Sequence, residues 1–187
     1  MIPKIVGFHG PYGSGKDTLG SALAETIPNS IISKFALPLY RMAAVIDPAF
    51  HITMTHAAKQ EFVLNREELG TRRNFLEKLG TDFGREMIHP DFWVTILAKY
   101  YEDVKAEYPF TTMIITDVRA ENEAAWIRRN DGIVFKLRPD WLINSNLETG
   151  HKITNELAED DRDAVLYLKE GKIKEAVDAI HARLLRQ

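Results

Sequence analysis

The stretch GFHGPYGSGKDTLG, residues 7–20, contains the pattern that decides the fold. Gly10 is followed, after four residues, by Gly15 and Lys16, and the run lies between an apolar β-rich segment and a segment with helical spacing. Strand, glycine loop and helix in this order are typical of a phosphate-binding loop, in which backbone N–H groups hold phosphate oxygens. Gly13 and Gly15 leave room for those groups, and Lys16 is placed to bridge two phosphates. The alternative is a tight strand–helix turn without a ligand.

The residue after the lysine is Asp17, where such loops usually have Ser or Thr, and Thr18 follows one place later. A hydroxyl at that later position can reach the nucleotide phosphates, while Mg²⁺ is held largely through water and substrate oxygens. The loop therefore resembles those of nucleoside monophosphate kinases more than those of GTPases. Asp17 could be a water-mediated Mg²⁺ ligand beside Thr18, or an acid favoured by the dipole at the helix N-terminus.

Composition sets limits on partners. The 187 residues suffice for one domain, and 45% apolar with 27% charged residues is ordinary for a soluble protein. The formal charge of -3 gives no net basic field for nucleic acid. The absence of cysteine excludes disulfides, thiolate metal sites and a cysteine nucleophile. Because no apolar run reaches about 18 residues, we expect no membrane span and a cytoplasmic location.

Apolar strand-like runs alternate with helical patterns, which predicts a parallel sheet with right-handed crossovers. Residues 47–60 show no period and are expected to form a mobile insertion. The helix that includes residues 71–79 is expected to stop at Gly80. The five predicted strands are Lys4–Phe8, Ser30–Ala36, Thr111–Arg119, 133–139 and one within 163–171.

A phosphoryl acceptor that is itself a phosphate needs a second anion pocket. Candidate cations are Arg41, Arg85 and the pair Arg72 and Arg73, of which only one should face the site, because adjacent helical positions point about 100° apart. Asp117 and Arg119 end an apolar strand, at the sheet edge where ligands gather. Asp117 could order Mg²⁺ and its waters or cap the next helix. Trp93 could stack on a base, although periodicity alone places it in the core.

Four motifs, SGKDT, RRNFLEKLGTDFGREMIHPDFW, IITDVRAENEAAWIRR and FKLRP, occur in the order and rough spacing of the bacteriophage deoxynucleoside monophosphate kinases. The chain resembles that family in patches from Ile5 to the terminal helix. The resemblance implies phosphorylation of dNMPs by ATP with Mg²⁺, and a host-cell cytoplasm if the chain is phage-encoded. It implies that ATP is held by Gly13, Ser14, Gly15, Lys16, Asp17 and Thr18, and the dNMP by Arg41, Arg73, Gly80, Thr81, Trp93, Asp117, Arg119 and Glu123, with Lys16 again close by.

We therefore expect one α/β P-loop kinase domain, residues 1–187, with a five-stranded parallel sheet flanked by helices. Its core would be 1–37 and 108–187, its inserted helical NMP-binding region 38–95, and its short lid 138–162, containing His151 and Glu156. Lys16, Arg119 and Asp117 would be catalytic, with ATP and a dNMP as small-molecule substrates and no nucleic acid. The resemblance allows a homodimer. The rivals are another small-molecule kinase, of the phosphomevalonate or dephospho-coenzyme-A type, and a non-catalytic nucleotide-binding module.

Overall fold

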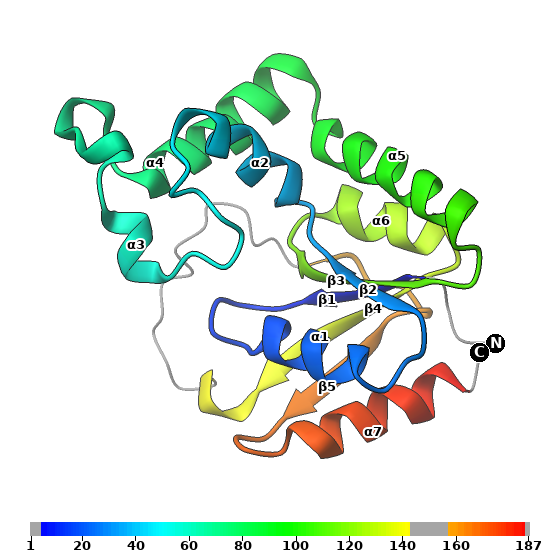
Figure 1. Cartoon of the computed structure of the whole chain (residues 1–187). Coiled ribbons are helices and arrows are strands. Elements are labelled where there is room, and N and C mark those ends of the chain that lie inside the picture. Colours follow the sequence, from blue (N-terminus) through cyan, green and yellow to red (C-terminus); the bar gives the residue numbers. More distant parts are fainter. Residues whose placement is uncertain (1–4, 143–156, 186–187) are drawn as a thin grey trace. The chain divides into compact units, whose positions relative to one another are not determined.

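The computed structural model describes residues 5–142 and 157–185 (Figure 1). The chain divides into two compact units, which are described separately. The core unit comprises Met1–Lys34 and Tyr101–Gln187, and the helical unit comprises Phe35–Tyr100. The expected lid falls largely on residues 143–156, so that His151 and Glu156 lie outside the described residues.

The core unit is built on a five-stranded sheet in the order β2-β3-β1-β4-β5, with every neighbouring pair parallel. This confirms the predicted α/β architecture with a five-stranded parallel sheet. Parallel strands buried on both faces have nearly continuous apolar sequences, which is why these strands could be predicted from apolar runs. The strands are β1 (Ile5–His9), β2 (Ser30–Ser33), β3 (Thr112–Val118), β4 (Ile133–Pro139) and β5 (Ala164–Leu168).

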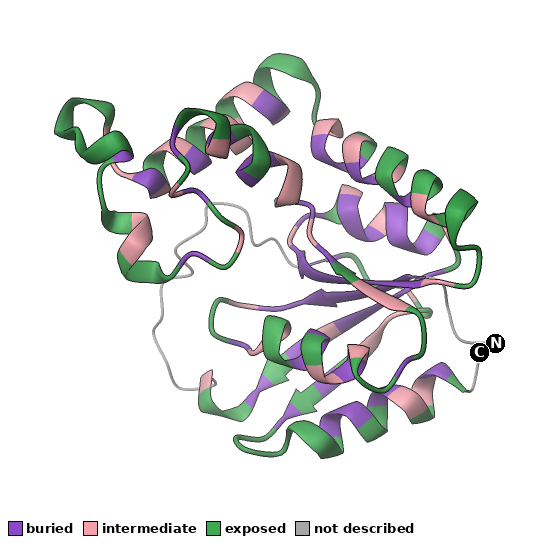
Figure 2. Cartoon of the chain, in the orientation of Figure 1, coloured by how far each residue is buried: buried purple, intermediate pink, exposed green. Residues whose placement is uncertain are grey.

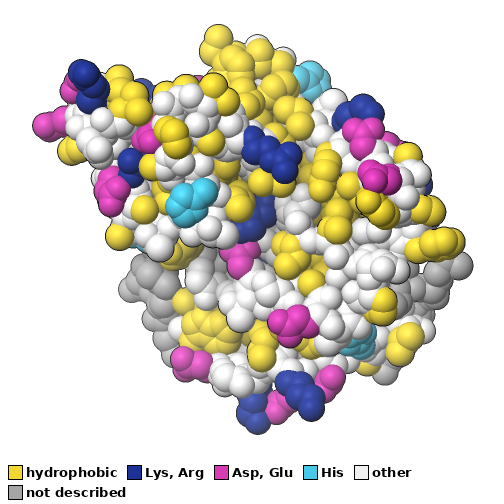
Figure 3. Space-filling view, in the orientation of Figure 1, with side chains coloured by type: hydrophobic (Ala, Val, Ile, Leu, Met, Phe, Trp, Pro, Cys, Tyr) yellow, Lys and Arg dark blue, Asp and Glu magenta, His cyan; other side chains and the backbone are white. Residues whose placement is uncertain are grey.

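Helices cover both faces of this sheet (Figure 1). Val6 and Phe8 of β1 face one apolar cluster, which contains buried residues of α1 (Lys16–Ala24) and α7 (Ile173–Leu184). Gly7 points the other way, toward α6 (Glu121–Arg129), where a Cβ atom would lie 2.6 Å from Ile127 Cδ1. The central strands are buried throughout (Figure 2), while charges of both signs lie along α7 at the lower edge of Figure 3.

The helical unit has its own apolar core, which includes Leu39, Phe50, Met54, Leu76 and Trp93. Its elements are α2 (Leu37–Ile46), α3 (His56–Gln60), the short turns η1 (Val63–Asn65) and η2 (Glu67–Leu69), α4 (Arg72–Glu77), the π-helix η3 (Lys78–Ile88) and the start of α5 (Phe92–Glu107). None of the described helices in either unit is both long enough and apolar enough to cross a bilayer.

The expectation of a mobile insertion at residues 47–60 is wrong, because this segment is anchored at three places. Phe50 and Met54 are buried in the core of the helical unit, and α3 begins at a Thr55 cap whose hydroxyl accepts the Ala58 N–H. Asp47 is also buried and forms an ion pair with Arg72, with 3.0 Å between Oδ2 and Nε. The anchors are isolated side chains without a helical period, so periodicity could not reveal them.

The expectation that a helix stops at Gly80 is wrong as well. The helical path runs on from α4 through η3 to Ile88, with the wider i→i+5 turns of a π-helix. Gly80 lies within these turns, and the path ends where the His89 N–H donates to Gly84 O at 3.1 Å.

Candidate functional site

The phosphate loop joins β1 to α1 at the carboxyl edge of the sheet. Gly13 and Gly15 have φ angles of 76° and 78°, in the left-handed region that glycine adopts without strain. Gly10 is needed for a different reason, since a Cβ there would lie 2.9 Å from Ser14 Oγ and 3.1 Å from Leu137 Cβ. The loop leads into the start of α1, whose first N–H groups have no partner within the helix and suit an anion.

Lys16 is the first residue of α1, and its ammonium is folded back over the loop. Nζ donates to Gly10 O at 2.8 Å, to Pro11 O at 2.7 Å and to Ser14 Oγ at 3.2 Å. Burial lowers the pKa of Lys16 to about 8, and the charge of Arg119 adds to this effect. A lysine with a lowered pKa beside a second cation is a strong anion site, because a phosphate oxygen would stabilise both charges.

We expect the affinity for ADP to fall above pH 8. Phosphate oxygens near Nζ raise the pKa of Lys16 in the complex. ADP therefore binds most tightly at a pH where Lys16 of the free protein is already protonated. Above the free-state pKa of about 8, the affinity should drop by up to about tenfold per pH unit, until the pKa of the complex is reached. Calorimetric titration with ADP between pH 7 and pH 10 measures this, and Lys16→Met should remove the slope; an equal slope in that variant would contradict the assignment.

Asp17 is held by two other elements of the core unit. Its Oδ1 accepts the Thr116 hydroxyl at 2.5 Å and pairs with Lys34 Nζ at 2.7 Å. Burial alone would raise the pKa of Asp17, but the bonds from Lys34 and Thr116 lower it below its usual range. Asp17 thus links α1 to β3 and to the end of β2. Sequence reasoning missed Lys34, which lies inside the predicted strand Ser30–Ala36 but follows the observed end of β2 at Ser33.

Asp117 and Arg119 lie at the carboxyl end of β3, next to β1 in the sheet. Asp117 is buried and Arg119 is partly exposed. Because β3 pairs in parallel with β1, both residues lie at the edge of the sheet that carries the phosphate loop. Their charges act on the pKa of Lys16, Arg119 lowering it and Asp117 raising it. The predicted residues Lys16, Asp17, Asp117 and Arg119 therefore gather at one edge of the core unit.

Glu123 was expected to contact the acceptor nucleotide, but the structure gives it a different environment. Its side chain is buried, and Oε2 accepts the backbone N–H groups of Arg119 at 2.6 Å and Ala120 at 3.1 Å. These are bonds of a helix N-terminus, where an acidic residue in the first turn satisfies free donors. Glu123 thereby fixes the backbone from which Arg119 projects.

The oxygen donors near the loop fit Mg²⁺ that keeps most of its own water. Asp117 has a carboxylate and Thr18 a hydroxyl on an exposed residue, and the Asp17 carboxylate is bound by Lys34 and Thr116. No cluster of three or more acidic or histidine ligands occurs in residues 5–142 and 157–185. Mg²⁺ suits such a site, because it is usually bound by one or two protein oxygens together with substrate phosphates.

In the helical unit, Arg41 lines a cavity of about 290 Å³. The other lining residues belong to α2 and α5 and are apolar or aromatic; they include Pro38, Met42, Ile96 and Tyr100. An apolar cavity with one cationic group is suited to an organic ligand that carries a negative charge.

Arg72 and Arg73 are neighbours in sequence with opposite environments. The Arg72 side chain is 6% exposed and pairs with Asp47 at 3.0 Å and with Glu61 at 2.6 Å. Arg73 is 27% exposed and pairs with Glu77 one turn away, at 3.0 Å. The expectation that only one of the two arginines can meet a ligand agrees with this arrangement, and Arg73 is the more accessible.

Trp93 lies in the core, as its periodicity indicated, and not on a surface where a base could stack. It is 3% exposed, and its Nε1 donates to Gly80 O at 2.7 Å. The ring also packs against Gly84, where a Cβ would lie 2.6 Å from Nε1. Trp93 therefore holds the π-helix that carries Gly80 and Thr81, both partly exposed.

Gly84→Ala should destabilise the helical unit, whereas Gly80→Ala should not. The new methyl at position 84 would overlap the rigid ring of Trp93, and overpacking of this kind typically costs about 1–3 kcal/mol. The nearest atom to a Cβ at position 80 is Leu39 Cδ2 at 3.4 Å, an ordinary contact. Urea unfolding of both variants measures the difference, and equal stability would contradict the packing described here.

Comparison with known proteins shows that the chain matches the model of a known protein family. The model of the deoxynucleotide monophosphate kinase family matches residues 40–180. A deoxynucleoside-5'-monophosphate kinase of Escherichia phage T5 is 24% identical in an alignment of 185 residues that covers 68% of this chain and 72% of that protein. A protein of Acanthamoeba polyphaga mimivirus, provisionally named a deoxynucleotide monophosphate kinase, is 26% identical over 156 residues, covering 71% and 72%. An unliganded sugar kinase of Janibacter sp. HTCC2649 superposes with a TM-score of 0.48 at 16% identity, covering 97% and 94%, too distant to add to the family evidence.

Proposed function

The chain belongs to the deoxynucleotide monophosphate kinase family, and from this premise we propose how its residues phosphorylate a deoxynucleoside monophosphate with ATP. The observation that carries the proposal is the phosphate loop, with two left-handed glycines and a lysine whose ammonium is held over it. ATP is the donor, and its phosphates bind to the backbone of residues 13–18 and to Lys16.

The core unit neutralises the charge that moves with the phosphoryl group. Phosphoryl transfer needs positioning and electrostatic stabilisation, not a covalent intermediate. Lys16 and Arg119 carry positive charge beside the loop, and they offset charge on the transferring group and on its leaving oxygen. Asp117 and Thr18 are the residues that would hold Mg²⁺ and its waters. The ion would supply further positive charge beside the phosphate oxygens. The acceptor phosphate is already ionised near neutrality, so no general base is required.

The helical unit supplies groups that bind the acceptor. Arg73 is the cation we assign to the dNMP phosphate, because Arg72 is committed to Asp47 and Glu61. Arg41 is a second candidate, on the cavity beside α2 and α5. Gly80 and Thr81 present their backbone and hydroxyl groups from the π-helix, which Trp93 holds in place.

The test is ADP release from Mg-ATP with each dNMP and each ribonucleoside monophosphate offered singly. We expect acceptor-dependent turnover with at least one deoxynucleotide. Phosphomevalonate and dephospho-coenzyme A serve as controls for the rival kinases, and turnover with either of these alone would contradict the proposal. ATP binding without turnover on any acceptor would indicate a non-catalytic nucleotide-binding module.

A further inference from the structure

An indole side chain donates a hydrogen bond to a backbone carbonyl of the phosphate loop. Trp141 Nε1 donates to Gly13 O at 3.1 Å, and its ring lies 4.0 Å from the position of a Cβ on Gly15. Trp141 belongs to the short turn η4 (Asp140–Leu142), which directly follows β4. Because β4 pairs in parallel with β1, with Phe135 opposite Phe8, the turn after β4 emerges beside the loop after β1.

The peptide unit between Gly13 and Ser14 is consequently held at both ends. Its carbonyl accepts the Trp141 indole N–H, and its N–H donates to Pro11 O at 3.2 Å. A rotation of this peptide would break both bonds. Rotation about ψ of Gly13 turns this peptide, and glycine has many alternative conformations when nothing fixes it.

One of these loop oxygens, that of Pro11, also accepts a bond from the catalytic lysine. Pro11 O accepts from Lys16 Nζ at 2.7 Å as well as from the Ser14 N–H. A loop that lost its shape at Gly13 would therefore also move an acceptor of Lys16. Trp141 is 37% exposed, against 3% for Trp93 and 8% for Trp126, so its ring is not required to fill the core.

We propose that Trp141 is a positioning residue that keeps the phosphate loop in its anion-binding shape before nucleotide arrives. This inference rests on the proposed function, since it assigns a residue to the ATP side of that reaction. Binding to a flexible loop includes the cost of ordering it, and a preformed loop avoids that cost. The indole N–H should therefore affect affinity for ATP and ADP and leave affinity for the acceptor unchanged.

The deciding variant is Trp141→Phe, which keeps an aromatic ring and removes the N–H donor together with part of the indole ring system, whose contact with the Cβ position on Gly15 is only a 4.0 Å approach. Calorimetry with ADP should show binding about three- to tenfold weaker than in the parent chain, the loss expected for one neutral hydrogen bond. The KM for ATP should rise by a similar factor, with the KM for the dNMP unchanged. Trp126→Phe is the matched control, because Trp126 packs edge-on against Tyr101 on another helix. This variant should bind ADP with the affinity of the parent chain.

Normal ADP affinity in Trp141→Phe would overturn the inference. So would an equal rise in KM for both substrates, or a large fall in melting temperature, because either would mean that Trp141 supports the core unit in general. Failure of the proposed function gives a different result, namely a parent chain that binds ADP but phosphorylates no deoxynucleotide. In that case the comparison of ADP affinities still decides the role of Trp141.

Discussion

Lys16→Met should lower kcat by about 100- to 1,000-fold, the loss seen when one preorganised donor to a developing charge is removed. Methionine keeps the length and the apolar stem of lysine, so the change is confined to the ammonium. That ammonium is held by three oxygens of the loop and is partly desolvated, which makes its interaction with phosphate stronger than that of a surface lysine. Steady-state ADP release with saturating Mg-ATP and the best acceptor measures the effect.

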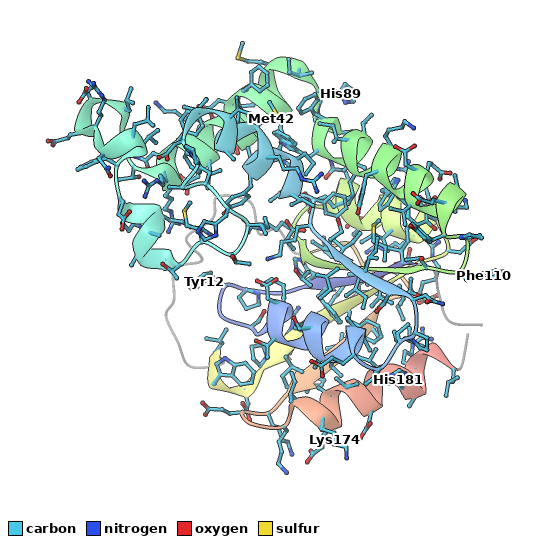
Figure 4. The ribbon with its side chains drawn as sticks, in the orientation of Figure 1. Tyr12, Met42, His89, Phe110, Lys174 and His181 are labelled. Atoms are coloured by element: carbon cyan, nitrogen blue, oxygen red, sulfur yellow. The ribbon has the colours of Figure 1, made fainter. Side chains whose placement is uncertain are left out.

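The control for this variant is Lys174→Met, which removes an exposed lysine on the outer side of α7 (Figure 4). We expect normal kcat and an unchanged free energy of unfolding from it, and Lys16→Met should stay folded, since Lys16 is not part of the apolar core. Loss of less than tenfold in Lys16→Met, with the fold intact, would mean that the loop does not perform the transfer. An equal loss in both variants would point to a general effect of charge.

The sheet and the phosphate loop could be predicted from local sequence because each depends on a pattern of neighbours. The central strands β1 and β3 are largely apolar runs buried along their whole length, and the loop needs glycine at the two positions where φ is positive. The gathering of Asp117 and Arg119 near Lys16 then followed from the rule that parallel strands end at one edge.

The contacts that could not be predicted join residues far apart in the chain. Nothing local indicates that Lys34 and Thr116 hold Asp17, or that Asp47 pairs with Arg72 and turns a segment without periodicity into part of a core. Gly80 has the form of a helix stop, yet the helical path continues because Trp93, thirteen residues later, binds the Gly80 carbonyl. Such side-chain pairs are set by tertiary packing, which overrides a local propensity of about 1 kcal/mol.

The adjacent residues Arg72 and Arg73 should give opposite results when each is changed to methionine. Arg72→Met leaves Asp47 buried without its guanidinium partner, and removal of one member of a buried ion pair typically costs about 3–5 kcal/mol. The two N–H groups that Asp47 accepts, from Ala49 and Leu64, do not neutralise its charge. Urea unfolding should therefore show a large loss of stability in this variant.

Arg73→Met removes a partly exposed pair with Glu77 on the same helix, a pair worth less than about 1 kcal/mol. Its stability should stay close to that of the parent chain, while kcat/KM for the dNMP falls by about 10- to 100-fold, as expected for a lost hydrogen bond to a charged phosphate. The KM for ATP should not change. A stable Arg72→Met variant would contradict the buried pair, and normal acceptor kinetics in Arg73→Met would remove Arg73 from the acceptor site. The reverse pattern, with Arg72 affecting the acceptor and Arg73 the stability, would assign the two residues the other way round.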